Sequence, residues 1–261
     1  GDIIVKLGAE DIVSAADFIS AVKNLNGDET TITVRREDNL KQFNISPVLS
    51  EDGVYKLGLM LRDAVSGVGT LTFFDPETGV YGALGHSISD ADTGEVLPLS
   101  EGSITDTEIV GVIPGQAGTP GELSGKSEAA DVLGDIRINC GCGIFGIADL
   151  SDENAVETGK IQTGNASIYC TVSGADVSEY SISVDKVSDV DGYTVAKLHV
   201  TDPELLSLTG GIVQGMSGSP IMQDGHLVGA VTHVFVNDPT GGYGISIQDM
   251  IKAAEDTAEA A

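Results

Sequence analysis

Glycine divides this sequence into short apolar runs, and this spacing limits the possible folds more than any other feature. The 261 residues include 34 glycines, which is about twice the average usage. Valine, isoleucine and threonine are frequent between the glycines, and tryptophan is absent. Since β-branched residues favour strands and glycine favours tight turns, the sequence predicts many short strands joined by glycine turns. The length suffices for one large domain or two smaller ones with a sizeable core.

Residues 1–48 follow a different pattern, in which a helix stands between two strands. Residues 3–7 and 30–37 read as strands, and Ser14 is a suitable N-cap for the helix between them. The apolar residues of this helix share one face: Phe18, Ile19, Val22 and Leu25. This order resembles the second half of a PDZ domain, without the carboxylate-binding loop and the groove strand of the first half. A generic strand–helix–strand cap is the alternative interpretation.

The rest of the chain, residues 49–261, is predicted to form a second domain of mostly β structure. Residues 67–86 place two apolar runs around an Asp-Pro-Glu-Thr-Gly turn, and residues 226–247 repeat this hairpin pattern. Short strands and glycine turns alternate between the two hairpins. Residues 248–261 are predicted to form a C-terminal helix that frays at its acidic, alanine-rich end.

The composition excludes several classes of partner. The formal net charge of −27 repels nucleic acid and anionic lipid, so we expect no nucleic-acid partner. No EF-hand calcium-loop pattern occurs, and Cys140, Cys142 and Cys170 lack the spacing of a zinc site. We therefore expect no metal and no organic cofactor, and a structural or incidental role for the cysteines. No stretch has the length of a transmembrane helix, and no signal-peptide pattern is present.

The segment Gly-Met-Ser-Gly-Ser-Pro at 215–220 is the main candidate for chemistry. It is not a nucleophile elbow, because Ser219 replaces the last glycine and a hairpin, not a helix, is expected to follow. It is either an ordinary tight turn or the Gly-x-Ser-Gly-x-Pro loop that it resembles in chymotrypsin-like peptidases. In such a loop Ser217 is the nucleophile, and the backbone amides of Gly215 and Ser217 form the oxyanion hole.

Four histidines are candidates for the general base. Chymotrypsin-like enzymes order their residues His, Asp, Ser, so the base must precede Ser217 and is either His86 or His199. His86 fits the first barrel of such an enzyme, whereas His199 lies in a strand pattern with an expected solvent-facing side chain. His226 is expected in an exposed turn, and His233 in a strand near the serine.

Four motifs in order make the resemblance more specific. Residues 55–63, 67–90, 113–125 and 211–245 are similar to segments of the SpoIVB family of sporulation serine peptidases. The resemblance implies a chymotrypsin-like double β-barrel behind a partial PDZ domain, and a Ser-His-Asp triad. The triad then maps onto Ser217, His86 and Asp202, which lies 15 residues before the serine.

Without the resemblance, Asp202 ranks beside other acids: Asp90, Asp92 and Asp185. The hairpin after the serine forms one wall of the substrate pocket in chymotrypsin-like folds, which makes Thr232 and His233 candidates for substrate binding. Strand alternation places neighbouring side chains on opposite faces, so we expect only one of these two to line the pocket.

The resemblance also implies a biological role. Members of this family are signalling endopeptidases secreted across the inner forespore membrane into the intermembrane space. There they cleave themselves and a membrane-bound regulator of an intramembrane protease, which activates the late mother-cell sigma factor. A complete PDZ domain would add peptide binding. The alternative is a catalytically silent PDZ-peptidase scaffold that binds protein partners.

Overall fold

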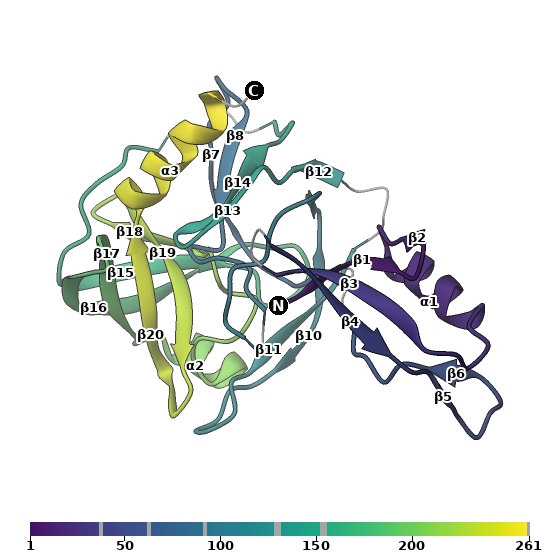
Figure 1. Ribbon diagram of the computed structural model, residues 1–261. Coiled ribbons are helices and arrows are strands. Elements are labelled where there is room, and N and C mark those ends of the chain that lie inside the picture. Colours follow the sequence, from purple (N-terminus) through teal and green to yellow (C-terminus); the bar gives the residue numbers. More distant parts are fainter. Residues whose placement is uncertain (37–38, 62–63, 91–92, 128–131, 152–155, 260–261) are drawn as a thin grey trace. The chain divides into compact units, whose positions relative to one another are not determined.

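The computed structural model describes residues 1–36, 39–61, 64–90, 93–127, 132–151 and 156–259 (Figure 1). The chain divides into two compact units, Gly1–Ser66 and Gly67–Ala261. The segment after residue 48, which the sequence suggested as the start of the second domain, is grouped with the first unit. It holds the short paired strands β5 (Val48–Leu49) and β6 (Tyr55–Lys56), and the Tyr55 ring lies against Gly27.

The first unit is a four-stranded antiparallel sheet with one helix. The strand order is β2 (Glu10–Asp11), β1 (Ile3–Leu7), β3 (Thr30–Arg36) and β4 (Asn39–Ile45). Helix α1 (Ala15–Lys23) begins at Ser14, whose side chain caps the helix reciprocally with Asp17. The small core holds Leu7, Phe18, Ala21, Ile32 and Val34.

The predicted strand–helix–strand order is therefore confirmed, with one change on the helix. Phe18 is buried, but Ile19 is 50% exposed, and Ala21 takes its place in the core. The assignment of this unit to a PDZ domain stays a prediction.

The second unit contains a closed barrel of six antiparallel strands. Around the barrel the strands run β15 (Gly164–Cys170), β16 (Ser178–Val190), β17 (Tyr193–Val200), β20 (Asp238–Ser246), β19 (His226–Phe235) and β18 (Pro220–Gln223). Side chains alternate as expected along β17, where Leu198 and Val200 are buried and His199 between them is exposed.

An open sheet and two separate strand pairs complete the β structure of this unit. The open sheet has the order β13 (Ile138–Cys140), β14 (Gly143–Ile147), β8 (Val80–Ala83) and β7 (Leu71–Phe74). The pairs are β10 (Glu108–Ile113) with β11 (Glu122–Lys126), and β9 (Ser103–Thr105) with β12 (Val132–Asp135). The mostly β prediction is confirmed, and the fold is consistent with the chymotrypsin-like class. Among the described residues one barrel is closed.

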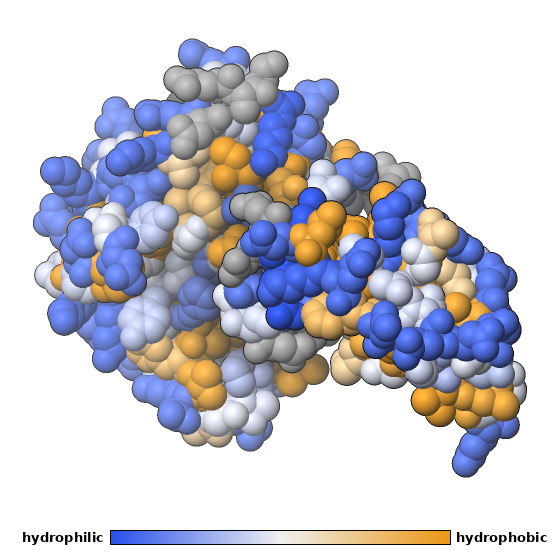
Figure 2. Space-filling model, in the orientation of Figure 1, coloured by the Kyte–Doolittle hydropathy of each residue, from blue (hydrophilic) through white to orange (hydrophobic). Residues whose placement is uncertain are grey.

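Two helices belong to the second unit. The predicted C-terminal helix is α3 (Ile247–Glu259), which packs against β8, β14 and β19 (Figure 1). Helix α2 (Pro203–Thr209) was not predicted, and it begins directly after Asp202. None of the helices in the described ranges is long and apolar enough to cross a membrane. The face shown in Figure 2 is mostly hydrophilic, in agreement with the large net charge.

Candidate active site

The loop that carries Ser217 runs from the end of α2 to β18 and is held by backbone hydrogen bonds on both sides. The Ser217 carbonyl accepts from Thr70 N–H at 2.8 Å, and Gly218 N–H donates to the Val231 carbonyl at 2.8 Å. Gly218 has a φ of 94°, and a Cβ here would lie 1.9 Å from the Thr70 oxygen and 2.6 Å from the Leu84 nitrogen. Only glycine fits this position, which explains the small residue after Ser217.

Of the two serines in the loop, only Ser217 is accessible. Its side chain is half-buried, and its hydroxyl donates to the Thr232 carbonyl at 2.8 Å. Ser219 has no exposed surface, and its hydroxyl has no hydrogen-bond partner within the described part of the chain. A substrate can therefore meet Ser217 but not Ser219.

His86 follows the open sheet and contacts β19, the strand that also contains Thr232. It follows β8 through Leu84 and Gly85, which have left-handed φ values of 68° and 69°. A Cβ on Gly85 would lie 3.0 Å from the Thr232 methyl group, and the His86 ring packs on the His233 ring with centroids 4.4 Å apart. Ser217 and His86 are thus both in contact with the stretch Thr232–His233 of β19.

A β-bulge in β19 lies at this stretch. Val231 pairs with Gly244 and Val234 with Gly242, so three steps along β19 match two along β20. This irregularity interrupts strict alternation at Thr232 and His233. The expectation that only one of the two side chains lines the substrate pocket stays a prediction. The Thr232 carbonyl contacts Ser217, and the His233 ring contacts His86.

The imidazole of His86 is oriented by its own backbone neighbour. Its Nδ1 lies 2.8 Å from the Ser87 carbonyl, which can only accept, so Nδ1 carries the proton in this hydrogen bond. In the neutral ring, Nε2 then has the free lone pair that a general base needs.

Desolvation has the largest effect on the pKa of both histidines. Burial lowers the pKa of His86 below its ordinary value, against the opposing effect of the Ser87 hydrogen bond. His233 is exposed to solvent, yet partial desolvation of its ring and the charge on His86 lower its pKa. A carboxylate beside the imidazole would raise the His86 pKa, whereas here the pKa is lowered because burial outweighs the Ser87 hydrogen bond.

Sequence reasoning did not find Asn139, a residue of β13 that holds the segment after His86. The Asn139 side chain accepts from Ile88 N–H at 2.8 Å and donates to the carbonyls of Ile88 at 2.8 Å and Leu97 at 3.0 Å. These bonds fix the backbone one residue beyond the Ser87 carbonyl that orients His86. No local pattern signals this role, because the Asn139–Ile88 contact joins positions 51 residues apart.

The two predicted oxyanion-hole N–H groups donate no hydrogen bond within the described structure. In the described structure Met216 N–H donates to the Val213 carbonyl at 3.1 Å, whereas the N–H groups of Gly215 and Ser217 have no acceptor. Gly215 has a φ of 102°, and a Cβ at this residue would lie 2.9 Å from Leu123 of β11. Two free N–H groups flank the site of the nucleophile, as an oxyanion hole requires.

Asp202 caps helix α2. Its carboxylate accepts from the N–H groups of Glu204 at 2.9 Å, Leu205 at 3.1 Å and Ser181 at 3.2 Å. Although desolvation opposes the change, these hydrogen bonds lower the pKa of Asp202. Within the described part of the chain, His86 interacts with the Ser87 carbonyl and the His233 ring, and it has no hydrogen bond to Asp202 there.

The rival acids also have other partners. Asp90 accepts from Thr93 N–H at 2.9 Å, and Asp185 accepts from the Ser183 hydroxyl at 2.8 Å. Asp92 lies outside the described residues. The structure thus brings together Ser217, Gly215, His86 and the Thr232–His233 stretch, and places Asp202 at a helix terminus.

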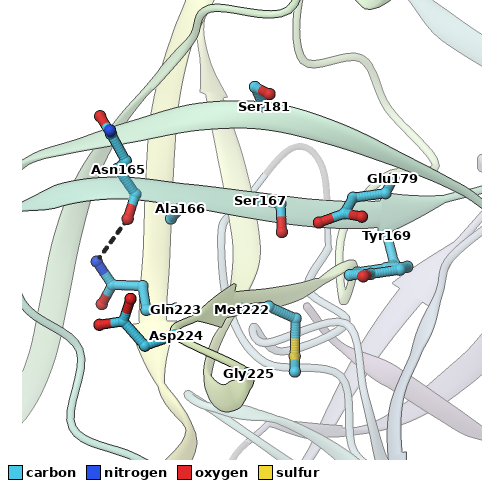
Figure 3. A pocket seen from close by; sticks show the side chains of 10 residues that line it. All are labelled: Asn165, Ala166, Ser167, Tyr169, Glu179, Ser181, Met222, Gln223, Asp224 and Gly225. Atoms are coloured by element: carbon cyan, nitrogen blue, oxygen red, sulfur yellow. Dashed lines mark hydrogen bonds between the residues drawn. The ribbon is translucent and has the colours of Figure 1, made fainter.

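Two other features of the described residues lie outside this site. A shallow, mainly polar pocket on the barrel is formed by β15, β16 and the β18–β19 turn (Figure 3). Its walls contain none of the predicted site residues; they are Asn165, Ala166, Ser167, Tyr169, Glu179, Ser181, Met222, Gln223, Asp224 and Gly225. No group of three or more His, Cys, Asp or Glu side chains in the described ranges is placed to hold a metal ion.

A histidine and an accessible serine that contact the same stretch of β19, on a mostly β fold, are consistent with a serine peptidase. The model of the SpoIVB peptidase S55 family matches residues 53–251 of this sequence. Because this match spans more than half of the chain, the protein belongs to that family, and the resemblance seen in its motifs is confirmed. No curated protein and no solved structure matches the chain significantly. Residues 1–52 lie outside the family match, so the PDZ interpretation is untested.

Proposed function

We propose that this protein is a serine endopeptidase in which Ser217 is the nucleophile and His86 is the general base. The observation that carries this proposal is the convergence of both side chains on Thr232–His233, beside two backbone N–H groups without acceptors. Ser219, the other serine of the loop, is fully buried.

The reaction follows from these positions. The Ser217 hydroxyl first turns from the Thr232 carbonyl to Nε2 of His86. Its oxygen then attacks the peptide carbonyl carbon as the proton moves to the imidazole. The N–H groups of Gly215 and Ser217 bind the oxyanion, and each is worth about 3 kcal/mol in the transition state. Collapse of this intermediate expels the amine, which takes the proton from His86, and water then hydrolyses the acyl-enzyme.

Two groups are candidates for the acceptor that orients the His86 imidazole. The family resemblance assigns Asp202, which would hold the imidazole tautomer and stabilise the imidazolium. The geometry supports the Ser87 carbonyl, which already accepts the Nδ1 proton at 2.8 Å. We propose that Ser87 orients the base in this conformation, and the catalytic role of Asp202 stays a prediction.

A fluorophosphonate probe tests the nucleophile, because it labels an activated serine without requiring a known substrate. We expect the wild-type chain to be labelled and Ser217→Ala to be unlabelled while circular dichroism shows an intact fold. Ser219→Ala is the matched control and should keep its label, since the removed hydroxyl is buried and unpaired. Labelling that persists in Ser217→Ala and vanishes in Ser219→Ala would overturn the assignment.

The biological role is proposed from the family membership. We propose that the enzyme acts in sporulation signalling in the space between the two forespore membranes. Its substrates there would be a membrane-bound regulator of an intramembrane protease and the enzyme's own N-terminal region. Incubation of purified wild-type and Ser217→Ala chains with that regulator tests this role. Cleavage by the wild-type chain alone supports it, and an intact regulator beside a probe-reactive enzyme contradicts it.

The second candidate function is a catalytically silent scaffold that binds protein partners. One observation favours it: the Ser217 hydroxyl is directed at a backbone carbonyl in the resting structure. The probe experiment separates the two functions, because a silent scaffold leaves both the wild-type chain and Ser219→Ala unlabelled.

A further inference from the structure

Two cysteine thiols meet at the turn between β13 and β14, on a part of the second unit that the peptidase mechanism does not use. The Sγ atoms of Cys140 and Cys142 lie 3.4 Å apart, and neither cysteine is in a disulfide. Only Gly141 separates them, and its α-carbon faces the Tyr193 ring. A disulfide between them requires the two sulfur atoms to approach to about 2.05 Å.

The two thiols differ in access. Cys140 is half-buried and reaches the surface, whereas Cys142 is 1% exposed. The Cys142 sulfur also lies 3.9 Å from the Asp249 carbonyl of α3, in the core shared by that helix and the open sheet. A reagent in solution therefore reaches the Cys140 sulfur and not the buried Cys142 sulfur.

Contact with its neighbour and burial set the acidity of Cys142. The contact with Cys140, followed by burial, raises the pKa of the Cys142 thiol above its ordinary value. Cys142 therefore keeps its proton in the resting dithiol, so the attacking group is the more accessible Cys140. Thiol–disulfide exchange needs an accessible cysteine that attacks the disulfide and a second, nearby cysteine that resolves the mixed disulfide, and this pair supplies both.

We propose that Cys140 and Cys142 form a dithiol–disulfide couple that exchanges with low-molecular-weight disulfides. In the first step the Cys140 thiolate attacks a disulfide, whose S–S bond breaks to leave a mixed disulfide on Cys140 and one released thiol. Cys142 then attacks the Cys140 sulfur, forms the Cys140–Cys142 bond and releases the second thiol. The two cysteines lose two electrons and two protons, and the reagent is reduced to two thiols that carry those protons.

Cys170 provides a contrast within the same chain. It lies inside the barrel on β15, and burial raises its pKa to about 12. Its thiol is neither accessible nor readily ionised, so it should not react in the folded protein. The experiment can therefore use Cys170 as an internal control for intact folding.

The test is to incubate the folded full chain with oxidised glutathione, quench with acid, alkylate under denaturing conditions and map the cysteines by mass spectrometry. We expect an intramolecular Cys140–Cys142 disulfide, with Cys170 alkylated. Cys142→Ser should instead retain one glutathione on Cys140, because no second thiol displaces it. Cys140→Ser should stay free of glutathione, since Cys142 is buried, and Cys170→Ser should behave as wild type.

Two results would overturn the proposal: three alkylated cysteines in the wild-type chain, or a stable glutathione adduct on wild-type Cys140. The wild-type measurement alone is decisive if a variant fails to fold. The outcome does not depend on peptidase activity, since Ser217→Ala should form the same disulfide.

Discussion

At the scale of single residues, His86 shows how burial sets the working pH of a catalytic group. Burial lowers the pKa of His86, so the imidazole stays neutral further into the acid range than an ordinary histidine. Since the base must be neutral to accept the Ser217 proton, we expect the rate of fluorophosphonate labelling to rise with pH and to level off below about pH 6.5, the ordinary histidine value. Labelling rates across the pH range measure this. An inflection clearly above the ordinary value would show that a carboxylate, and not burial, governs His86.

Asp202 tests which acceptor orients the base. Asparagine caps helices about as well as aspartate does, so Asp202→Asn should keep α2. Its amide group replaces the oxygen that accepts from Ser181 N–H, so we expect a small loss of stability. If the Ser87 carbonyl orients His86, labelling by the probe should fall by less than about tenfold. A loss on the order of 10⁴-fold, the cost of losing a triad aspartate, would show that Asp202 reaches His86 in the active enzyme.

The matched variant Asp202→Ala separates the capping role from the catalytic one. It removes the acceptor for three backbone N–H groups and should cost about 1 kcal/mol of stability. Thermal unfolding of both variants measures this difference. Equal stability of Asp202→Ala and the wild-type chain would contradict the capping role.

At the scale of elements, β13 supports the catalytic segment through Asn139. Asn139→Ala removes three hydrogen bonds to the backbone around Ile88, so the Ser87 carbonyl and His86 lose their fixed position. We expect kcat to fall by about 10²-fold with little change in KM, because misplacement of a base weakens the chemical step more than binding. Steady-state kinetics on a cleaved protein substrate measure the two parameters.

Two controls make this prediction specific to positioning. Asn139→Asp keeps an acceptor for Ile88 N–H and should retain part of the activity lost in Asn139→Ala. Thermal unfolding reports whether either variant loses its fold. A rise in KM with unchanged kcat would show that Asn139 serves substrate binding instead.

The bulge in β19 makes His233 a candidate for substrate selection. Its side chain is exposed at the site while its ring contacts His86. His233→Ala should therefore change the cleavage profile on a peptide library, whereas His199→Ala, on an exposed face of β17, should not. Profiles that match between His233→Ala and the wild-type chain would remove His233 from the substrate site.

At the scale of the whole molecule, local patterns in the sequence predicted most elements. The Ser14 cap, the hairpins β7–β8 and β19–β20 and the terminal helix α3 all follow from spacing over a few residues. Helix α2 was missed, although Asp202 followed by proline is a recognised start signal. The family resemblance assigns this aspartate to catalysis, whereas in the structure it caps the helix.

The sequence by itself determined the mostly β class, the glycine-bounded serine loop and the family, because these depend on composition and short motifs. Only the tertiary structure decided which groups meet. Three features depend on packing and strand register between segments far apart in the chain. They are the burial of Ser219, the contact of Asn139 with Ile88 and the bulge at Thr232. Short-range patterns do not encode such pairings, since register and burial are set only when distant strands share one core.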